Sequence, residues 1–472
     1  MIPIKTSRIY LRFVCLLTLA VLILALTGCT CLTRTEYLRP EVNLPEKWQT
    51  LPNSGEQVMA ISQWWQVFED PLLNRLIAEA LKTNNDLAVA ALKVRKARLA
   101  AGLEATEQNP VLSVSASLGK QKDLHSGGQT DSSGTTTGLS WELDLWGKLA
   151  SSRDAAEWEA KATEQDMANT ALSLVGTTAD LYWQIAYLNQ AIATSREGID
   201  YTLKTMELVE VKYTTGAVSE LELLQAEQNM ENQKADLADL NQQMVEARNA
   251  LAVLFGQAPE GVPADPKRLT DMPLPALEAG IPAAVLGNRP DLKAAELRLR
   301  SILADGDSTR TSYYPSLSLT STLGTSSSQM LNLLSNPVAA LGAGLTLPFV
   351  QWQQMKFNTR IAENEYEQAV TAFRQSLYEA LQDVANALSA REYYTIQETA
   401  LRRSCSLAKK AEQATKVRYR VGKTGVQEWL DQQELRRQAD LSLAKNRYNQ
   451  LKNQITLYMA LGGDTDLVEK VQ

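Results

Sequence analysis

Residues 112–118 read LSVSASL, so that apolar side chains alternate with serines at every second position. A related stretch, SLSLTSTL, lies at residues 316–323. Residues 139–145 and 341–349 alternate in the same way between apolar and small or acidic side chains. Segments of about ten residues with this period are typical of transmembrane β-strands. A strand of a soluble sandwich alternates identically, so the pattern alone leaves both interpretations open.

These strands belong to a sequence that contains an internal repeat. VKYTTG at residues 211–216 corresponds to VRYRVG at 417–422, an offset of 206. PVLSV at 110–114 corresponds to PSLSL at 315–319, an offset of 205 that also separates Asp86 from Asp291. Matches in order at nearly one offset predict two structural repeats. Each repeat reads as a helix (residues 72–107 in the first), two strands, a long helix and a shorter helix.

Four strands are too few to close a membrane barrel. Bacterial barrels made by one chain have about eight strands or more. An open sheet edge cannot sit in lipid, because its backbone groups would have no hydrogen-bond partners. Membrane strands in this chain, with a Gly/Ser/Thr-rich loop expected over residues 126–137, therefore require several chains to share one barrel.

The helix after the first strand pair is expected to be very long. Residues 147–214 contain no proline, which allows a helix of roughly 68 residues, or about 100 Å at 1.5 Å per residue. Leu172, Val175 and Ala179 are spaced by three and four residues, and so are Leu377, Leu381 and Val384 in the second repeat. This spacing predicts coiled-coil packing.

The N-terminus predicts export and lipidation. Basic residues precede an apolar run at 13–25, and LTGC follows at 26–29. This pattern is a secretory signal peptide, and the run is short for a membrane span of about 20 residues. LTGC resembles the lipobox of bacterial lipoproteins, which implies cleavage before Cys29 and acylation of that cysteine, with palmitate among the chains. An ordinary signal peptide with an incidental cysteine is the alternative. Cys31 is either a second lipid site or a spare thiol.

Composition argues against nucleic-acid binding and catalysis. The net charge of −7 disfavours a nucleic-acid partner. The single histidine, His125, lies in the polar loop, so a His-dependent triad or metal site has no support. No CxxC or phosphate-binding Gly-rich motif occurs in the sequence. We therefore expect no enzyme, cofactor or metal site, and a conducting function in which pore-lining residues set selectivity.

Six segments are expected along the chain. They are a signal peptide over 1–28, a lipid-anchored N-terminal extension over 29–71, the first repeat over 72–256, a proline-rich equatorial connector over 257–289, the second repeat over 290–463 and a C-terminal tail over 464–472.

Four motifs resemble those of the TolC/OprM family of outer-membrane efflux proteins. They are WWQVFEDPL at 64–72, RPDLKAAE at 289–296, YRVG at 419–422 and YMALGG at 458–463. The resemblance covers essentially the whole chain after Cys29, and the lipobox is similar to that of the OprM-like lipoprotein branch. It implies a mainly α protein with a transmembrane β-barrel. Three chains would supply four strands each to a 12-stranded barrel on a long α-helical barrel that crosses the periplasm.

The resemblance also implies a location and partners. The chain would sit in the outer membrane, anchored in its lipid, and extend into the periplasm as a homotrimer. Its partners would be a periplasmic adaptor protein and an inner-membrane transporter, commonly of the proton-driven resistance-nodulation-division type. Such a channel conducts drugs or other toxic small molecules to the exterior.

The resemblance assigns a gate to the turns of the long helices. Glu428 and Asp431 match acidic residues that ring the periplasmic entrance, and six carboxylates in a trimer should recruit cations and raise their own pKa values. Two ordinary solvated charges are the alternative. Tyr419 matches the family's tyrosine, and Glu222 occupies the acidic position on the other hairpin. A Tyr419–Glu222 hydrogen bond is therefore expected to lock the entrance.

Three residues near this gate depart from the family pattern. Thr424 stands where a well-known relative has a locking arginine, Gln427 replaces a frequent apolar constriction residue, and Glu434 replaces a frequent basic residue. The contacts that close the periplasmic entrance are therefore expected to be looser or to be made by different residues. In the barrel, Glu142 and Asp144 either make the lumen acidic or only solvate its base.

Two other functions stay open at this point. One is the exit duct of a type I protein secretion system, for which the same architecture would serve. The other is a non-conducting periplasmic coiled-coil scaffold lipoprotein, which has no need of four alternating segments repeated at one offset.

Overall fold

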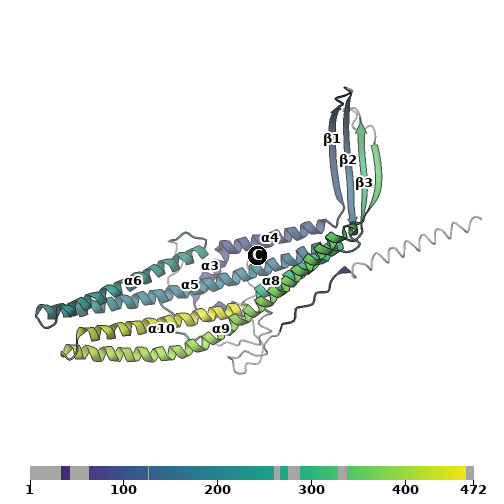
Figure 1. The fold of residues 1–472 in the computed structure, drawn as a ribbon. Coiled ribbons are helices and arrows are strands. Elements are labelled where there is room, and N and C mark those ends of the chain that lie inside the picture. The colour runs from purple at the N-terminus through teal and green to yellow at the C-terminus, as the bar shows by residue number, and fades with distance from the viewer. Residues whose placement is uncertain are drawn as a thin grey trace, which may run out of the picture. The chain divides into compact units, whose positions relative to one another are not determined.

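The structure is a computed structural model that describes residues 33–42, 63–125, 127–259, 266–274, 287–327 and 337–463. Helices dominate it, and four strands form one sheet (Figure 1). The elements in order are η1 (Trp64–Phe68), α3 (Pro71–Thr83), α4 (Asn85–Thr106), β1 (Val111–Lys122), β2 (Gln129–Leu143), α5 (Lys148–Thr214), α6 (Glu220–Leu254), α8 (Pro290–Thr311), β3 (Ser316–Ser327), β4 (Pro337–Thr346), η2 (Pro348–Gln351), α9 (Trp352–Arg420) and α10 (Val426–Ala460).

The order of elements confirms the two repeats. In the first repeat α4 is followed by β1, β2, α5 and α6, and in the second α8 is followed by β3, β4, α9 and α10. Helices α5 and α9 have 67 and 69 residues, as the absence of proline from residues 147–214 predicts for the first of them.

The predicted helix over 72–107 is wrong in one respect, because the chain breaks at Asn84. This residue is extended, with φ −69° and ψ 126°. Its side chain accepts a hydrogen bond from Leu87 N at 2.9 Å and so caps α4. Its amide group donates to Leu254 O, also at 2.9 Å. The Asn84 side chain therefore bonds both the start of α4 and a distant carbonyl. These bonds compensate for the interruption of the helix.

Two strand boundaries also differ from the prediction. The loop expected over 126–137 is shorter, because β2 already begins at Gln129 and pairs with β1. Ser and Thr side chains bond their own or neighbouring backbone in loops but also fit strands, so composition alone could not exclude a strand there. Strand β4 ends at Thr346, and Phe349 lies in η2. Pro348 has no backbone N–H with which to continue a ladder.

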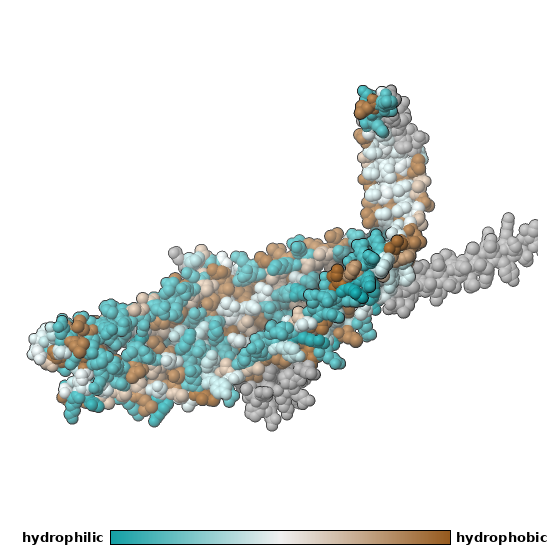
Figure 2. Space-filling view, in the orientation of Figure 1, coloured by the Kyte–Doolittle hydropathy of each residue, from teal (hydrophilic) through white to brown (hydrophobic). Residues whose placement is uncertain are grey.

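The sheet is antiparallel throughout, in the order β1-β2-β3-β4. Between β2 and β3, Trp141 is paired with Leu319 and Ser140 with Thr320, whereas Leu139 is paired with Ser321. Several apolar side chains on the strands are exposed, and Figure 2 shows them beside the pale small residues of the sheet. They include Leu112, Val114, Leu118, Leu323 and Leu341. Among the described residues, strands β1 and β4 each have only one neighbouring strand.

The chain forms two compact units, and each repeat contributes to both. One unit includes Lys93–Glu164 and Ala294–Arg374, and therefore the whole sheet. The other includes the described residues of Gln165–Lys293 and those from Gln375 on, and therefore helices α6 and α10.

Aliphatic and aromatic side chains both contribute to the core of the second unit. The seam residues Val175 and Ala179 on α5 are buried. On α9, Val384 and Leu388 pack with Leu457 of α10 in one cluster. The predicted coiled-coil positions therefore lie in the interior of helical hairpins.

Candidate functional site

The two helical hairpins end in turns of the same geometry. Gly216 and Gly422 have φ of +75° and +73°, which L side chains rarely adopt. Gly216 N bonds Tyr213 O, and Gly422 N bonds Tyr419 O at the corresponding position. The glycines end α5 and α9 by a left-handed turn at which the next helices can start. The repeated VxYxxG motif therefore builds the tips of both hairpins.

A hydrophobic cluster behind these turns joins all four helices. Tyr419 of α9 and Trp429 of α10 pack with Val209 of α5 and Ala226 of α6. The rings of Tyr419 and Trp429 are 5.2 Å apart at 32°. Lys212 Nζ lies 3.9 Å from the centre of the Tyr419 ring, within the range of a cation–π contact. We call this group the tip cluster.

The expected lock residues lie close to one another but are not hydrogen-bonded. Tyr419 Oη and Glu222 Oε2 are both buried, and neither has a hydrogen-bond partner among the described residues. Burial raises the pKa of Tyr419 to about 12, and the charge of Glu222 adds to the rise. A phenol can donate to a carboxylate, so each of these two unsatisfied atoms is a suitable partner for the other. The Tyr419–Glu222 lock therefore stays a prediction.

The acidic pair lies on the exposed first turns of α10. Glu428 and Asp431 are both exposed. The Thr424 hydroxyl donates to Glu428, and Gln427 Nε2 donates to Asp431 Oδ1 at 2.6 Å. Two of the three residues that depart from the family pattern therefore bond the acidic pair.

The third departure, Glu434, belongs to an ion-pair group between the hairpins. Arg437 NH2 lies 2.7 Å from Glu434 Oε1 on α10 and 2.5 Å from Asp236 Oδ2 on α6. Burial raises the pKa of Glu434, but the hydrogen bonds and charge of Arg437 outweigh burial and leave that pKa below its usual value. A basic residue at position 434 would repel Arg437, so the acidic residue fits this arrangement.

A buried carboxylate that the sequence does not mark lies nearby. Glu412 of α9 is 4% exposed. Its Oε1 accepts from Tyr201 Oη of α5 at 2.7 Å, and its Oε2 accepts from Arg436 NH1 of α10 at 3.2 Å. Lys416 Nζ donates to the Tyr201 hydroxyl at 2.8 Å. Before folding, Glu412 is one of many glutamates in a polar helix, and no spacing or motif distinguishes it.

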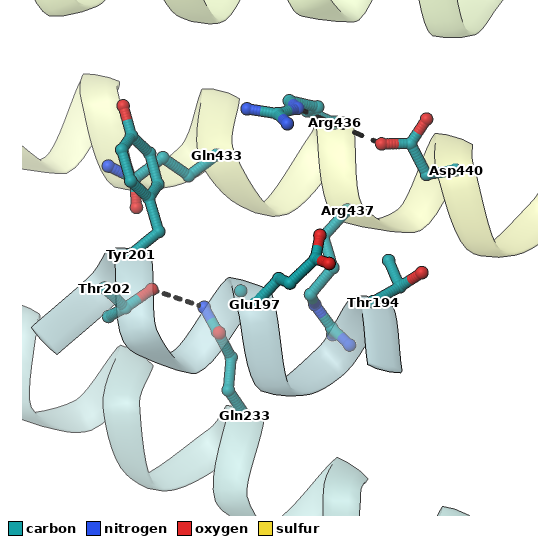
Figure 3. A pocket seen from close by; sticks show the side chains of 10 residues that line it. Thr194, Glu197, Tyr201, Thr202, Gln233, Gln433, Arg436, Arg437 and Asp440 are labelled. Carbon is teal, nitrogen blue, oxygen red and sulfur yellow. Dashed lines mark hydrogen bonds and ion pairs between the residues drawn. The ribbon is translucent and has the colours of Figure 1, made fainter. Parts of the chain in front are cut away.

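A polar cavity of about 250 Å³ lies between α5, α6 and α10. Gly198 opens it, because a Cβ at that position would come within 3.3 Å of Gln233 Oε1 and 3.2 Å of Arg437 Cδ. Gln233 Nε2 donates to Thr202 Oγ1 at 2.9 Å. Figure 3 shows the lining side chains, with Arg436 directed toward Asp440. The hairpins are therefore joined here largely by polar groups.

The two carboxylates proposed for the barrel lumen have local partners. Glu142, in β2, lies 2.6 Å from Lys148 Nζ. Asp144 accepts from Ala150 N at 2.8 Å, in the first turn of α5. Pairing offsets the charge of Glu142, and Asp144 satisfies a free N–H of the helix end.

The lipidation candidate Cys29 and its neighbour Cys31 lie outside the described residues. Thr33–Val42, which we call the N-terminal strap, lies along the unit that holds the sheet. Arg34 pairs with Asp154 at 2.8 Å, and Thr35 bonds the Asp307 carboxylate through both its N–H and its hydroxyl, each at 2.7 Å. The chain just beyond the candidate cysteines is therefore firmly attached.

The lone histidine and the described cysteine do not form a further site with neighbouring residues in the described part of the chain. His125 is exposed, and its N–H donates to Asp123 at 2.8 Å. Within these residues no group of three or more His, Cys, Asp or Glu side chains could hold a metal ion. Cys405 is a free, buried thiol. Among the helices of the described part, none is long and apolar enough to cross a membrane.

Two repeats of strands and long helical hairpins, with charged and aromatic groups at the hairpin tips, define a channel subunit. A family model described as "Outer membrane efflux protein" matches residues 76–257 and 281–463. The chain belongs to the outer membrane efflux protein family. It is the outer-membrane component of an efflux pump. Family members are channels, and they form homotrimers in tripartite systems.

Similar proteins support this placement. "Toxin and drug export protein A" of Aggregatibacter actinomycetemcomitans is 31% identical over 85% of this chain and 88% of its own length. The pyoverdine export outer membrane protein OpmQ of Pseudomonas putida is 30% identical over 96% and 97%. The open-state crystal structure of the Neisseria gonorrhoeae MtrE outer membrane channel matches with a TM-score of 0.79 and 29% identity, over 92% of this chain and 98% of that one.

Proposed function

We propose that three copies of this chain close a 12-stranded β-barrel in the outer membrane and a helical tunnel in the periplasm, with a gate at the hairpin tips. The observation that carries this proposal is the open sheet, in which β1 and β4 each lack a second neighbour within the part of the chain that the structure describes. Exposed leucines and valines on the strands suit lipid, but free edges do not. Pairing β4 of one copy with β1 of the next removes every edge.

The native mass of the protein tests the assembly. In a mild detergent the purified protein should have the mass of three chains. The barrel proposal would be wrong if the folded protein were a monomer or a dimer under these conditions. Substituting proline for Ala343, in the middle of β4, should prevent assembly because proline cannot donate a ladder hydrogen bond. Ala343→Val, which keeps the backbone N–H and suits a strand, is the control and should still assemble.

At the gate, Glu428 and Asp431 would supply six carboxylates to the trimer. Unit charges about 4 Å apart interact by about 1 kcal/mol in bulk water and by several times more near protein. A ring of such groups attracts cations to a narrow entrance. Tyr419 and Glu222, whose Oη and Oε2 atoms are buried and have no hydrogen-bond partner among the described residues, would lock the hairpins when the channel is at rest.

Cys29 would anchor the chain through lipid. The support is the LTGC lipobox and the attached N-terminal strap that begins four residues later, at Thr33. Mass spectrometry of the N-terminal peptide should find an acylated Cys29. An unmodified Cys29 at a free N-terminus would contradict the anchor, and the same spectrum would show whether Cys31 carries lipid.

The cargo would be drugs or other toxic small molecules, delivered by a periplasmic adaptor and an inner-membrane transporter of the resistance-nodulation-division type. A second candidate is a duct for exported protein, which the relative named as a toxin and drug export protein favours. Both need the same conduit. In a host that lacks its own efflux channel, restored drug resistance together with a proton-driven partner pump would support the first.

In the barrel, Glu142 and Asp144 would line the lower lumen. Because Lys148 pairs with Glu142 and Asp144 caps α5, their effect on cation preference would be smaller than that of the acidic pair at the tip.

A further inference from the structure

The two hairpins share a buried polar network behind the tip cluster. We call it the Glu412 network and define it as Tyr201, Glu412, Lys416, Trp429 and Arg436. Tyr201 comes from the first hairpin, and the other members come from the second. Glu412 accepts from Tyr201, Arg436 and, at 3.5 Å, from Trp429 Nε1. One carboxylate therefore connects α5, α9 and α10.

The network compensates for the negative charge of Glu412, which is shielded from water. The Glu412 side chain is 5% exposed, and a buried carboxylate is costly unless charges and hydrogen bonds compensate for it. Its bonds at 2.7 and 3.2 Å meet the normal geometry. Burial and the hydrogen bond to Glu412 both raise the pKa of Tyr201, so its hydroxyl stays protonated and remains a donor. Separating the hairpins would leave Glu412 without the one partner that comes from α5.

The network is in direct contact with the proposed gate. Trp429 is its shared member, because its ring packs on Tyr419 at 5.2 Å and meets Tyr201 edge-on at 6.3 Å. Glu412 and Tyr419 are seven residues apart on α9, which is about two helical turns. A movement of α9 and α10 that released Tyr419 from the first hairpin would also strain the Tyr201–Glu412 bond.

We propose that the Tyr201–Glu412 hydrogen bond is a second latch of the closed channel. It rests on the proposed gate at the hairpin tips, but it differs from the Tyr419–Glu222 lock in residues and in position. Glu412 is a positioning residue: it holds α9 and α10 against α5 and does not touch the conducted molecule. The bond is already formed, whereas the lock atoms are unpaired, so the latch contributes more to the closed state of this chain.

Single-channel recording in planar bilayers tests the latch. Tyr201→Phe removes only the hydroxyl, and Glu412→Gln removes the charge. Each should raise the ratio of open to closed time about tenfold, which corresponds to about 1.4 kcal/mol. The double variant should gain little more than either single variant, because both remove the same bond. Tyr393→Phe and Glu392→Gln, exposed residues of α9, are the matched controls and should gate like wild type.

Assembly and gating are read separately in this experiment. Native mass shows whether each variant is a trimer. If Glu412→Gln fails to assemble, the gating of Tyr201→Phe alone tests the latch. Trimeric Tyr201→Phe that gates like wild type would overturn the latch and leave the proposed gate standing. A wild-type channel with no closed state at all would overturn the gate and the latch together.

Discussion

Gln427 Nε2 donates a hydrogen bond of 2.6 Å to Asp431 Oδ1, one turn further along α10. Thr424 bonds Glu428 in the same i, i+4 relation. Two of the three residues that depart from the family pattern, Thr424 and Gln427, therefore orient the acidic pair. A hydroxyl and an amide leave both carboxylates charged, whereas an arginine at either position would neutralise them. The structure thus favours an entrance that is more acidic than one with a locking arginine.

The acidic pair should set the ion preference of the channel. Glu428→Gln combined with Asp431→Asn removes up to six negative charges from a trimer. We expect cation selectivity, measured as the reversal potential across a KCl gradient, to fall by half or more. The control is Glu392→Gln, 30 residues from the turn at Gly422. An unchanged reversal potential would mean that the two carboxylates are ordinary solvated charges.

Removing the proposed lock should allow large hydrophilic molecules to enter cells through the channel. Tyr419→Phe with Glu222→Gln eliminates the phenol and the carboxylate charge while keeping both shapes. A Gram-negative host without its own efflux channel, expressing this variant, should become several-fold more sensitive to a large hydrophilic antibiotic. Tyr213→Phe, at the repeat-related and more exposed position, should have no effect. If cells with the double variant are no more sensitive to the antibiotic than cells with the wild-type protein, the Tyr419–Glu222 lock is not part of the gate.

Arg437 should be needed for the stability of the hairpin tips. Arg437→Leu leaves Glu434 and Asp236 without their shared cation. Hydrogen bonds to charged groups contribute about 1.5–3 kcal/mol, and exposure of Asp236 reduces that contribution here. Hydrogen exchange of residues 194–202 and 230–240 should accelerate by about tenfold. Lys234→Leu removes an exposed cation on α6 and should change exchange little. Equal exchange in both variants would show that Arg437 is dispensable.

The same group predicts a pH dependence. The pKa of Glu434 lies below its ordinary value, because the hydrogen bonds and charge of Arg437 outweigh burial. A depressed pKa contributes stability that is fully present above the unfolded-state value of about 4.5 and is lost as the pH falls through the folded-state value. Amide protection around Arg437 should therefore fall as the pH drops below about 4.5, and it should fall less in Glu434→Gln. Identical pH profiles would rule out this ion pair as the cause.

Gly462 should be essential for the end of the second hairpin. It has φ +95°, and a Cβ there would lie 2.8 Å from the Asn288 carbonyl carbon and 2.9 Å from Arg289 N. Backbone atoms cannot move aside as a flexible side chain would. Gly462→Ala should cost about 1–3 kcal/mol from the backbone conformation alone, read as a lower unfolding temperature. Gly425→Ala, where φ is −74° and the surroundings are open, should cost much less.

The order of strands and helices along the chain could be predicted, because hydrophobic periodicity and the internal repeat indicate it. The VxYxxG copies mark both hairpin turns, and period-two stretches mark all four strands. The break at Asn84 could not be predicted, because it depends on a bond to the Leu254 carbonyl, 170 residues away. The start of β2 was missed because Ser and Thr serve loops and strands equally well.

The candidate site could be predicted only where it follows a motif. Tyr419 and Glu428 lie within a few residues of Gly422, so the turn marks them. Glu412 and Arg437 are recognised only once α5, α6, α9 and α10 are packed together, since their partners from the first hairpin, Tyr201 and Asp236, are more than 200 residues away in sequence. The sequence alone predicts that Glu434 loosens the gate, whereas its ion pair with Arg437 gives it a structural role.

Current through a single reconstituted trimer tests the central claim most directly. The protein, shown to be trimeric by native mass, is added to a planar bilayer under a KCl gradient. A gated channel of this kind should give discrete, cation-selective steps separated by long closed periods. Verified trimers that pass no current in wild type and in the lock and latch variants alike would contradict the account and leave a non-conducting scaffold.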